Sequence, residues 1–164
     1  MAKPIEGRGM LIGLISDTHG QLRPQVFDRL EGVDRIFHAG DIGSLDVLAE
    51  LEALAPVQAV WGNTDGFDVR ARVPEIVEAE LEGWRFVVVH GHQLGSPRTE
   101  TLLDAHPNAD VIVYGHTHRP AVDRVGRRLV VNPGAAGPAR FGLAPSVALM
   151  TVERATVDVR ILEL

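Results

Sequence analysis

The first part of the chain alternates short apolar runs with helical patterns, and this alternation restricts its fold more than any other feature. The apolar runs are residues 10–16 (MLIGLIS), 35–40 and 57–62, and an unbroken apolar run is typical of a strand covered on both faces. The segments between them, residues 23–30 and 44–54, predict helices, because one has a proline near its first turn and the other has a serine cap and regularly spaced leucines. Strand and helix in alternation predict parallel βαβ units.

The rest of the chain favours antiparallel pairs of strands. Residues 75–90 predict two strands joined by a tight turn, and residues 98–106 predict a short helix that leads into a strand at 110–115. Residues 121–132 and 146–164 predict two further hairpins. Two packed sheets with helices on the outside accommodate both halves, so we expect an α/β fold.

Length and composition exclude several kinds of protein. With 164 residues the chain suits one domain with a substantial core, which we expect to be residues 10–164 after a flexible polar leader at residues 1–9. The chain has no cysteine, which excludes disulfides, thiolate nucleophiles and sulfur-ligated metal sites. Its formal net charge of -6 argues against stable binding of a nucleic-acid duplex.

The apolar runs also bear on where the protein works. None is long enough to span a membrane, and the first is too short for the core of a signal peptide. We therefore predict a cytoplasmic protein with no membrane partner. The sequence does not determine the oligomeric state and is compatible with a homo-oligomer.

Five of the predicted strands end in a glycine-flanked cluster of oxygen or imidazole donors. Taken singly, each cluster also fits an ordinary turn or helix cap. Imidazole recurs, however, and five of the seven histidines fall in such clusters. In parallel α/β sheets ligands bind at the edge where the strands end, so the conjunction of the clusters favours a binding site. The clusters contain Asp17 and His19, Asp41, Asn63 and Asp65, His90 and His92, and His116 and His118.

The spacing and type of these side chains indicate a metal site. Residues i and i+2 of an extended chain point the same way, so Asp17 and His19 can reach one point, and His116 and His118 can face one cavity and serve two neighbouring ions. Carboxylate, amide oxygen and imidazole together suit Mn, Fe, Zn, Co or Ni better than Ca. Two carboxylates against two divalent cations leave a surplus of positive charge for a hydroxide and a phosphate.

The ordered set of short motifs resembles the calcineurin-like metallophosphoesterase superfamily, and most of all its small single-domain bacterial and archaeal phosphodiesterases. Each motif is weak alone, but the order and spacing of the set are highly specific. The resemblance extends from about Leu11 to about Arg140. The motifs are DTH (17–19), GD (40–41), GNTD (62–65), HGH (90–92), GHTH (115–118) and NPGA (132–135).

The resemblance implies a four-layer α/β/β/α sandwich, in which two mixed β-sheets are flanked by helices and a dinuclear metal site lies at the strand ends. It implies hydrolysis of small phosphodiesters, nucleotide-derived ones among them, by a hydroxide between two divalent ions that attacks phosphorus in line. Manganese is the first candidate for both ions. One ion would be held by Asp17, His19, Asp41 and His118, and the other by Asp41, Asn63, His90 and His116, with Asp41 bridging.

One residue departs from the pattern of many members of the superfamily. Thr64 stands where those phosphoesterases have a histidine that is thought to protonate the leaving oxygen. General acid catalysis is typically worth about 10²–10⁴-fold. We therefore expect a preference for good leaving groups, or a proton supplied by water or by His92, a residue that could also contact the phosphate or orient its neighbours. The expected catalytic residues are Asp41, Asn63 and His92.

Several residues near the clusters are expected to support the site or the core. We expect His38 to pack beneath the site and Asp65 to orient a neighbouring ligand side chain. Arg140, in the glycine-rich segment after the last motif, could reach a phosphate but is more typical of a surface arginine. Trp61 and Trp84 are predicted core residues.

Two other functions stay compatible with the sequence. A phosphomonoesterase would need extra donors for a more highly charged substrate, and the sequence does not place them. A retromer subunit that shares this fold works mainly in protein assembly, so a non-enzymatic binding scaffold is the alternative from another class. The set of predicted ligands is complete in this chain, which favours an enzyme.

Overall fold

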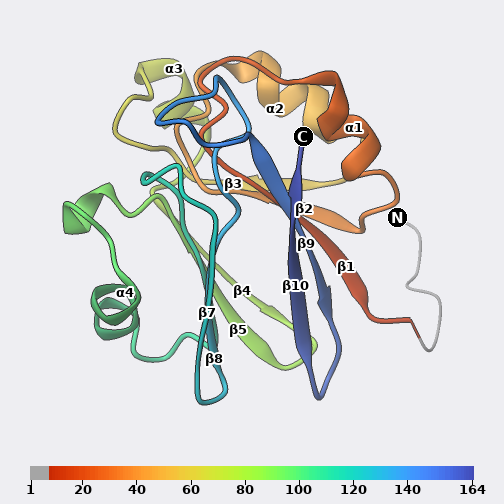
Figure 1. Cartoon of the computed structure of the whole chain (residues 1–164), viewed down its shortest axis with the longest axis vertical. Coiled ribbons are helices and arrows are strands. Elements are labelled where there is room, and N and C mark those ends of the chain that lie inside the picture. Colours follow the sequence, from red (N-terminus) through yellow and green to blue (C-terminus); the bar gives the residue numbers. More distant parts are fainter. Residues whose placement is uncertain (1–7) are drawn as a thin grey trace.

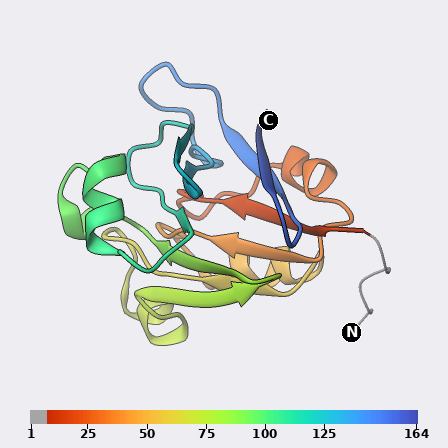
Figure 2. The ribbon, with the colours of Figure 1, turned by 90° about the horizontal axis from the view of Figure 1, so that it is seen from below.

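The computed structural model describes residues 8–164 as two five-stranded β-sheets packed face to face, with helices on the outer face of each sheet (Figures 1 and 2). The strand order is β10-β9-β1-β2-β3 in the first sheet and β4-β5-β6-β8-β7 in the second. This arrangement confirms the expected α/β/β/α sandwich. The strands are β1 (Met10–Ile15), β2 (Arg35–His38), β3 (Val57–Ala59), β4 (Ile76–Leu81), β5 (Trp84–Val89), β6 (Val111–Val113), β7 (Ala121–Val125), β8 (Arg128–Asn132), β9 (Ser146–Val152) and β10 (Val157–Glu163).

Parallel strands occur in both sheets. In the first sheet β1, β2 and β3 run parallel, and β9 and β10 add to β1 in antiparallel pairs. In the second sheet β5, β6 and β8 run parallel, so the second half of the chain contains a parallel centre in addition to the expected hairpins. The carboxyl ends of β1, β2, β3, β5 and β6 consequently lie at the same end of the molecule (Figure 1).

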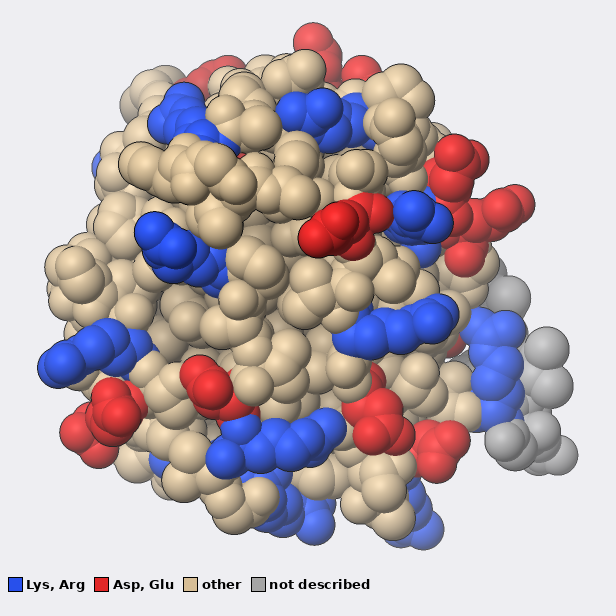
Figure 3. All heavy atoms as spheres, viewed as in Figure 1, with Lys and Arg blue, Asp and Glu red and all other residues tan. Residues whose placement is uncertain are grey.

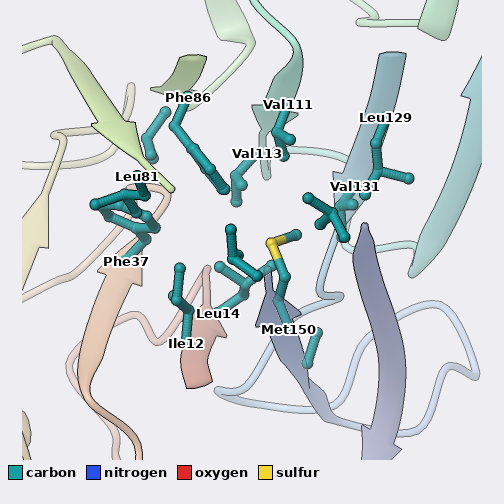
Figure 4. Packing of buried hydrophobic residues seen from close by; sticks show 14 of the residues in the cluster. Ile12, Leu14, Phe37, Leu81, Phe86, Val111, Val113, Leu129, Val131 and Met150 are labelled. Carbon is teal, nitrogen blue, oxygen red and sulfur yellow. The ribbon is translucent and has the colours of Figure 1, made fainter. Parts of the chain in front are cut away.

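The main core lies between the two sheets. Figure 4 shows Ile12, Leu14 and Phe37 of the first sheet facing residues of the second sheet such as Phe86. The ring centroids of Phe37 and Phe86 are 5.9 Å apart. Trp84 is buried in the same cluster, as predicted. Because alternate residues of each strand point inward, this core holds the two sheets in register and therefore fixes the ends of their strands relative to one another.

Short helices complete the outer layers. Val26 of α1 and Leu51 of α2 pack against the first sheet, and Leu102 of α4 packs against the second. Ser44 is the N-cap residue of α2, but its hydroxyl makes no capping hydrogen bond, which corrects the expected serine cap. The sequence does not predict α3, because this helix buries only Val69 and so lacks an apolar period. The helices are α1 (Pro24–Arg29), α2 (Leu45–Glu52), α3 (Phe67–Arg72), α4 (Thr99–Ala105) and the 3-10 helix η1 (His92–Leu94).

Three further expectations concern the ends and the surface of the chain. The predicted leader at residues 1–9 lies outside the described residues, apart from Arg8 and Gly9. Within residues 8–164, no helix combines the length and the apolar character needed to cross a bilayer. On the face shown in Figure 3, basic and acidic side chains are interspersed, and the basic ones do not form a continuous stripe.

Candidate metal centre

Five loops meet at the shared end of the two sheets and bring the predicted donor side chains together. They follow β1, β2 and β3 in the first sheet and β5 and β6 in the second. Backbone hydrogen bonds join neighbouring loops: the His19 N–H donates to the Asp41 carbonyl over 2.9 Å, and the Gly115 N–H donates to the His90 carbonyl over 3.0 Å. The site therefore spans both sheets.

The backbone at the site is left-handed rather than extended. Asp17, His19 and Asp41 have φ angles of 54°, 49° and 52°, and His116 and His118 have φ angles of 72° and 62°. Such residues cost on the order of 1–3 kcal/mol each and gather at functional sites. The side chains were expected to converge because residues i and i+2 of an extended chain point the same way. That reason is wrong, because they meet where each loop reverses direction in a left-handed conformation at the end of its strand.

Two glycines make the close approach of these loops possible. A Cβ atom on Gly62 would overlap Oδ1 of Asp41. A Cβ atom on Gly115 would overlap the Ser16 hydroxyl and would lie 2.7 Å from Oδ2 of Asp17. Any larger residue at either position would displace a predicted ligand.

The first group of donors surrounds Asp17. Its Oδ1 lies 3.4 Å from Nε2 of His118 and 3.9 Å from Nε2 of His19, and these two nitrogens are 3.3 Å apart. Oδ2 of Asp17 instead accepts hydrogen bonds from the Ser16 hydroxyl (2.7 Å) and from the His116 N–H (3.2 Å). These two donors fix the direction of the carboxylate, so that Oδ1 faces the imidazoles.

The second group of donors is centred on Asp41 and His90. Nε2 of His90 lies 3.3 Å from Oδ2 of Asp41 and 3.1 Å from Oδ1 of Asn63. The His90 Nδ1–H donates to the Ala39 carbonyl over 2.8 Å, an arrangement that orients metal-ligating imidazoles. Oδ2 of Asp41 also lies 3.9 Å from Nε2 of His19. Asp41 therefore stands between the two groups.

His116 and His92 lie beside the second group. The ring centroid of His116 is 5.2 Å from that of His90, with the rings edge to face. Two sets of donors among the described residues have ligand atoms that all lie within 4.8 Å of one another, and His116 belongs to neither set. The ring of His92 is 5.4 Å from that of His90 and 6.5 Å from that of His116.

Asp17 offers the strongest sign that the site takes a cation. Its Oδ1 is buried and has no hydrogen-bond partner among residues 8–164. Nε2 atoms of His19, His90 and His118 lie within 3.4–3.9 Å of this oxygen. Leaving a buried polar group unsatisfied costs about 1–3 kcal/mol, and more for a charged group. A divalent cation would satisfy the oxygen and the imidazoles together, so these residues fit a transition-metal ion.

Electrostatic interactions in the site act against the effects of burial. Burial raises the pKa of Asp41, but the hydrogen bond and charge of His90 outweigh it and hold the pKa well below the usual range. Burial lowers the pKa of His90, but the hydrogen bond to Asp41 and the charges of Asp17 and Asp41 raise it above the usual value. Burial lowers the pKa of His19 and of His116, which favours the neutral imidazole that binds metals.

His38 is wholly buried beneath the site, as predicted, and both of its ring nitrogens are paired. The Thr18 hydroxyl donates to the Ile42 carbonyl over 2.7 Å, so its oxygen accepts the hydrogen bond from His38 Nε2–H at 3.0 Å. Nδ1 of His38 accepts the Gly40 N–H over 3.2 Å. Burial lowers the pKa of His38 to about 4. The neutral ring therefore ties the loop after β1 to the loop after β2.

Asp65 binds backbone rather than a ligand side chain, which corrects the expectation for this residue. Its carboxylate accepts hydrogen bonds from the N–H groups of Gly62 (2.8 Å), Gly43 (2.8 Å) and Ile42 (3.2 Å). Asp65 thereby joins the loops after β2 and β3, which carry Asp41 and a further predicted ligand.

Sequence reasoning misses Arg70 and Ser16. Arg70 donates hydrogen bonds to the carbonyls of Asp65 (2.7 Å) and Asn63 (3.3 Å), and its guanidinium lies 4.3 Å from the ring centroid of Trp61. No signal reveals Arg70, because it belongs to the unpredicted α3. Trp61 is only partly buried, so the core prediction for it is half right. The sequence hints at the role of Ser16 only through its position directly before the predicted ligand Asp17, whose carboxylate its hydroxyl contacts.

The glycine-rich segment after β8 packs against the site. The Gly137 N–H donates to the Asp17 carbonyl over 3.2 Å. The side-chain amide of Asn132 donates to the Gly115 carbonyl over 3.1 Å. Arg140 in this segment is exposed, in agreement with the surface role expected for it.

The chain matches one family model over most of its length and is similar to proteins of known sequence. The calcineurin-like phosphoesterase superfamily domain matches residues 10–155. A probable metallophosphoesterase of Methanothermobacter thermautotrophicus is 36% identical over 160 residues, which cover 93% of this chain and 92% of that protein. A phosphodiesterase of Methanocaldococcus jannaschii is 29% identical over 165 residues, which cover 88% of this chain and 95% of that protein.

Similar solved structures share the sandwich. An archaeal phosphodiesterase matches with a TM-score of 0.72 at 29% identity, over 93% of this chain and 100% of that chain. A single mutant of Vps29 from Entamoeba histolytica matches with a TM-score of 0.78 at 25% identity, over 94% of this chain and 99% of that chain. Because the family match covers most of the sequence and a close relative covers nearly all of it, the chain belongs to the calcineurin-like phosphoesterase superfamily of metal-dependent hydrolases.

Proposed function

We propose that this protein hydrolyses small phosphodiesters with two divalent metal ions bound at the candidate metal centre. The observation that carries the proposal is Oδ1 of Asp17, a buried oxygen that has no hydrogen-bond partner among the described residues and faces three imidazoles. The relative named as a phosphodiesterase in Methanocaldococcus jannaschii supports a diester as the substrate.

We assign the two ions to overlapping sets of ligands. Asp41 bridges them in this assignment, since it lies within 3.3–3.9 Å of imidazoles from both groups. Mn²⁺ is our first choice, and Fe, Zn, Ni and Co suit the same oxygen and nitrogen donors. One ion takes Asp17, His19, Asp41 and His118, and the other takes Asp41, Asn63, His90 and His116.

When bound, two divalent ions would supply Lewis-acid polarisation of the phosphoryl oxygens and a water of lowered pKa. The chain itself orients the ligands before the substrate arrives. The Ala39 carbonyl holds the proton of His90 on Nδ1 and so directs Nε2 toward Asp41. His92 lies beside the ring of His116, and we assign it a contact with the phosphoryl group of the substrate. Rigid ligands keep the reorganisation needed during the reaction small.

Thr64 decides what kind of leaving group the site tolerates. Its backbone N–H donates to Oδ1 of Asp41 over 3.0 Å, which supports the bridging carboxylate. Its hydroxyl is far too weak an acid to protonate a leaving oxygen near neutral pH. We therefore propose that the leaving group takes its proton from water, and that diesters with good leaving groups react fastest.

The test is hydrolysis of bis(4-nitrophenyl) phosphate by the Mn²⁺-loaded protein, with 4-nitrophenyl phosphate as the monoester comparison. We expect faster turnover of the diester and a loss of at least about 100-fold in kcat/KM for Asp41→Ala and for His116→Ala. Glu50→Ala removes an exposed carboxylate on α2 and should retain full activity. Faster turnover of the monoester would identify a phosphomonoesterase instead.

A binding scaffold is the second candidate function. The likeness to Vps29, a protein named for vacuolar protein sorting, favours it. Metal-loaded protein that hydrolyses neither ester, while still binding Mn²⁺ in calorimetry, would support the scaffold and reject the enzyme.

A further inference from the structure

A turn close to the metal centre carries a residue that its backbone disfavours. The Leu143 N–H donates to the Arg140 carbonyl over 3.0 Å, and the two central residues, Phe141 and Gly142, have φ angles of 57° and 68°. Turns with two left-handed central residues favour asparagine, aspartate or glycine at the first of them. A bulky aromatic residue at this position is an outlier, so the needs of the turn do not explain Phe141.

The ring of Phe141 lies at the border of the metal centre. Its centroid is 5.9 Å from that of His118, and the two rings meet edge to face. His118 in turn is 3.4 Å from Oδ1 of Asp17. Phe141 nevertheless remains 72% exposed, so most of its ring surface is free for another group. The turn belongs to the light blue loop that protrudes from the ribbon in Figure 2.

A positive charge accompanies this ring. Arg140, the exposed residue directly before Phe141, lines the same small pocket as His118, so its guanidinium lies at the border of the metal centre. A phosphodiester carries one negative charge, which a neighbouring guanidinium attracts. An anionic group and a flat apolar group on one small molecule would therefore find complementary partners at this border.

We propose that Phe141 is a stacking platform for an aromatic group, such as a nucleobase, on the substituent that stays on phosphorus, and that it selects diesters with such a substituent over diesters with an alkyl substituent there. The proposal rests on the function proposed above and specifies the substrate class of the same site. Stacking of a base on an aromatic side chain tolerates any base, because every base presents a π-face. The backbone cost of Phe141 is then offset by substrate binding, as at other functional sites that break a local rule.

The experiment compares two diesters that share a leaving group. Both thymidine 5′-(4-nitrophenyl phosphate) and methyl 4-nitrophenyl phosphate release 4-nitrophenolate, so their kcat/KM values differ through the substituent that stays on phosphorus. We expect the Mn²⁺-loaded protein to prefer the thymidine diester. Phe141→Asn should reduce this preference by about tenfold, within the range of measured base–aromatic stacking.

The choice of variants distinguishes loss of aromatic stacking from loss of folding stability. Asparagine is favoured in a left-handed turn, so Phe141→Asn should have a melting temperature equal to or above that of the parent protein. Phe141→Tyr should keep the preference, and Phe141→Leu should lose it, because only tyrosine retains an aromatic face. Phe67, which is 89% exposed on α3, supplies the matched control Phe67→Ser, and the preference should be unchanged there.

A binding measurement distinguishes failure of this proposal from failure of the proposed function. By calorimetry on the Mn²⁺-loaded protein, Phe141→Asn should raise the Kd of thymidine 5′-monophosphate about tenfold and leave the Kd of inorganic phosphate unchanged. An unchanged thymidine preference together with an unchanged nucleotide Kd would overturn the platform while leaving the phosphodiesterase in place. Absence of diester hydrolysis with a nucleotide Kd that still depends on Phe141 would reject the enzyme and retain the platform.

Discussion

At the scale of single residues, hydrogen-bond partners set the protonation and the direction of the side chains at the site. His38 pairs one ring nitrogen with Thr18 and the other with the Gly40 N–H. His90 places its Nδ1–H on the Ala39 carbonyl. Each ring is thereby held in one tautomer, which is the condition for a nitrogen lone pair to face a chosen point.

For His38, we expect a neutral imidazole in the folded protein down to about pH 5, because burial lowers its pKa to about 4 from a reference value of 6.5. The unfolded chain takes up the proton first as the pH falls. The stability linked to His38 is therefore complete above pH 6.5 and declines between pH 6.5 and 4 by about 1.4 kcal/mol per pH unit. A histidine NMR titration measures the midpoint, and a value near 6.5 for His38 would contradict this account.

For Thr64, we expect that Thr64→His speeds hydrolysis of a diester with a poor leaving group, such as an alkyl diester. An imidazole at this exposed position can donate a proton to the leaving oxygen, and such catalysis is worth up to about 10²–10⁴-fold. Turnover of bis(4-nitrophenyl) phosphate should change little, since nitrophenolate needs no proton. Equal rates for Thr64→His and the parent protein on the alkyl diester would remove Thr64 as the cause of a leaving-group preference.

At the scale of elements, hydrogen bonds join loops that follow different strands. The Asp65 carboxylate binds backbone N–H groups of the loops after β2 and β3. The Gly137 N–H binds the carbonyl of Asp17, which joins the segment after β8 to the loop after β1. These junctions leave little room, and Gly62 is an example, because a Cβ atom added there would overlap the Asp41 carboxylate.

We expect Gly62→Ser to lower the free energy of unfolding by about 1–3 kcal/mol and to weaken Mn²⁺ binding at least tenfold, because the added Cβ overlaps Oδ1 of Asp41. Gly66→Ser is the matched control in the same loop. A Cβ at Gly66 meets its nearest heavy atom at 3.6 Å, and serine suits the N-cap of α3. Urea unfolding and calorimetry measure both quantities, and equal behaviour of the two variants would show that the overlap is relieved without moving Asp41.

At the scale of the whole molecule, the metal centre lies where the two sheets come together. Asp17 and Asp41 follow strands of the first sheet, whereas His90 and His118 follow strands of the second. The core between the sheets aligns their ends, but the donors of the two sheets face each other without a shared hydrogen bond at Oδ1 of Asp17. A bound cation would therefore link the sheets directly.

We expect Mn²⁺ to slow amide hydrogen exchange in both sheets at once. Protection should rise in the loops after β1 and β2 and equally in the loops after β5 and β6, because a shared ligand restricts local opening of all four. The β9–β10 turn is the internal control and should not change. Protection confined to one sheet, measured by mass spectrometry, would show that the cation does not bridge them.

Much of the fold could be predicted from the sequence, because strand and helix periods are local properties of a chain. The strands at residues 10–16, 35–40 and 57–62 were expected close to where β1, β2 and β3 lie. The parallel centre of the second sheet was not expected, because pairing among β5, β6 and β8 depends on contacts between distant segments. Helix α3 was missed because its one buried residue, Val69, leaves no period to detect.

The sequence by itself determined the chemistry of the site: which strand ends carry donors, that these are carboxylates, amide and imidazoles, and which superfamily arranges them in this order. Only the tertiary structure decided how they meet. Four features arise from contacts between loops far apart in the chain: the left-handed backbone of Asp17 and His118, the Asp17 Oδ1 that lacks a partner among residues 8–164, the backbone partners of Asp65 and the exposed ring of Phe141. Donor type is a property of one residue, whereas direction and pairing depend on the packing of two sheets against each other.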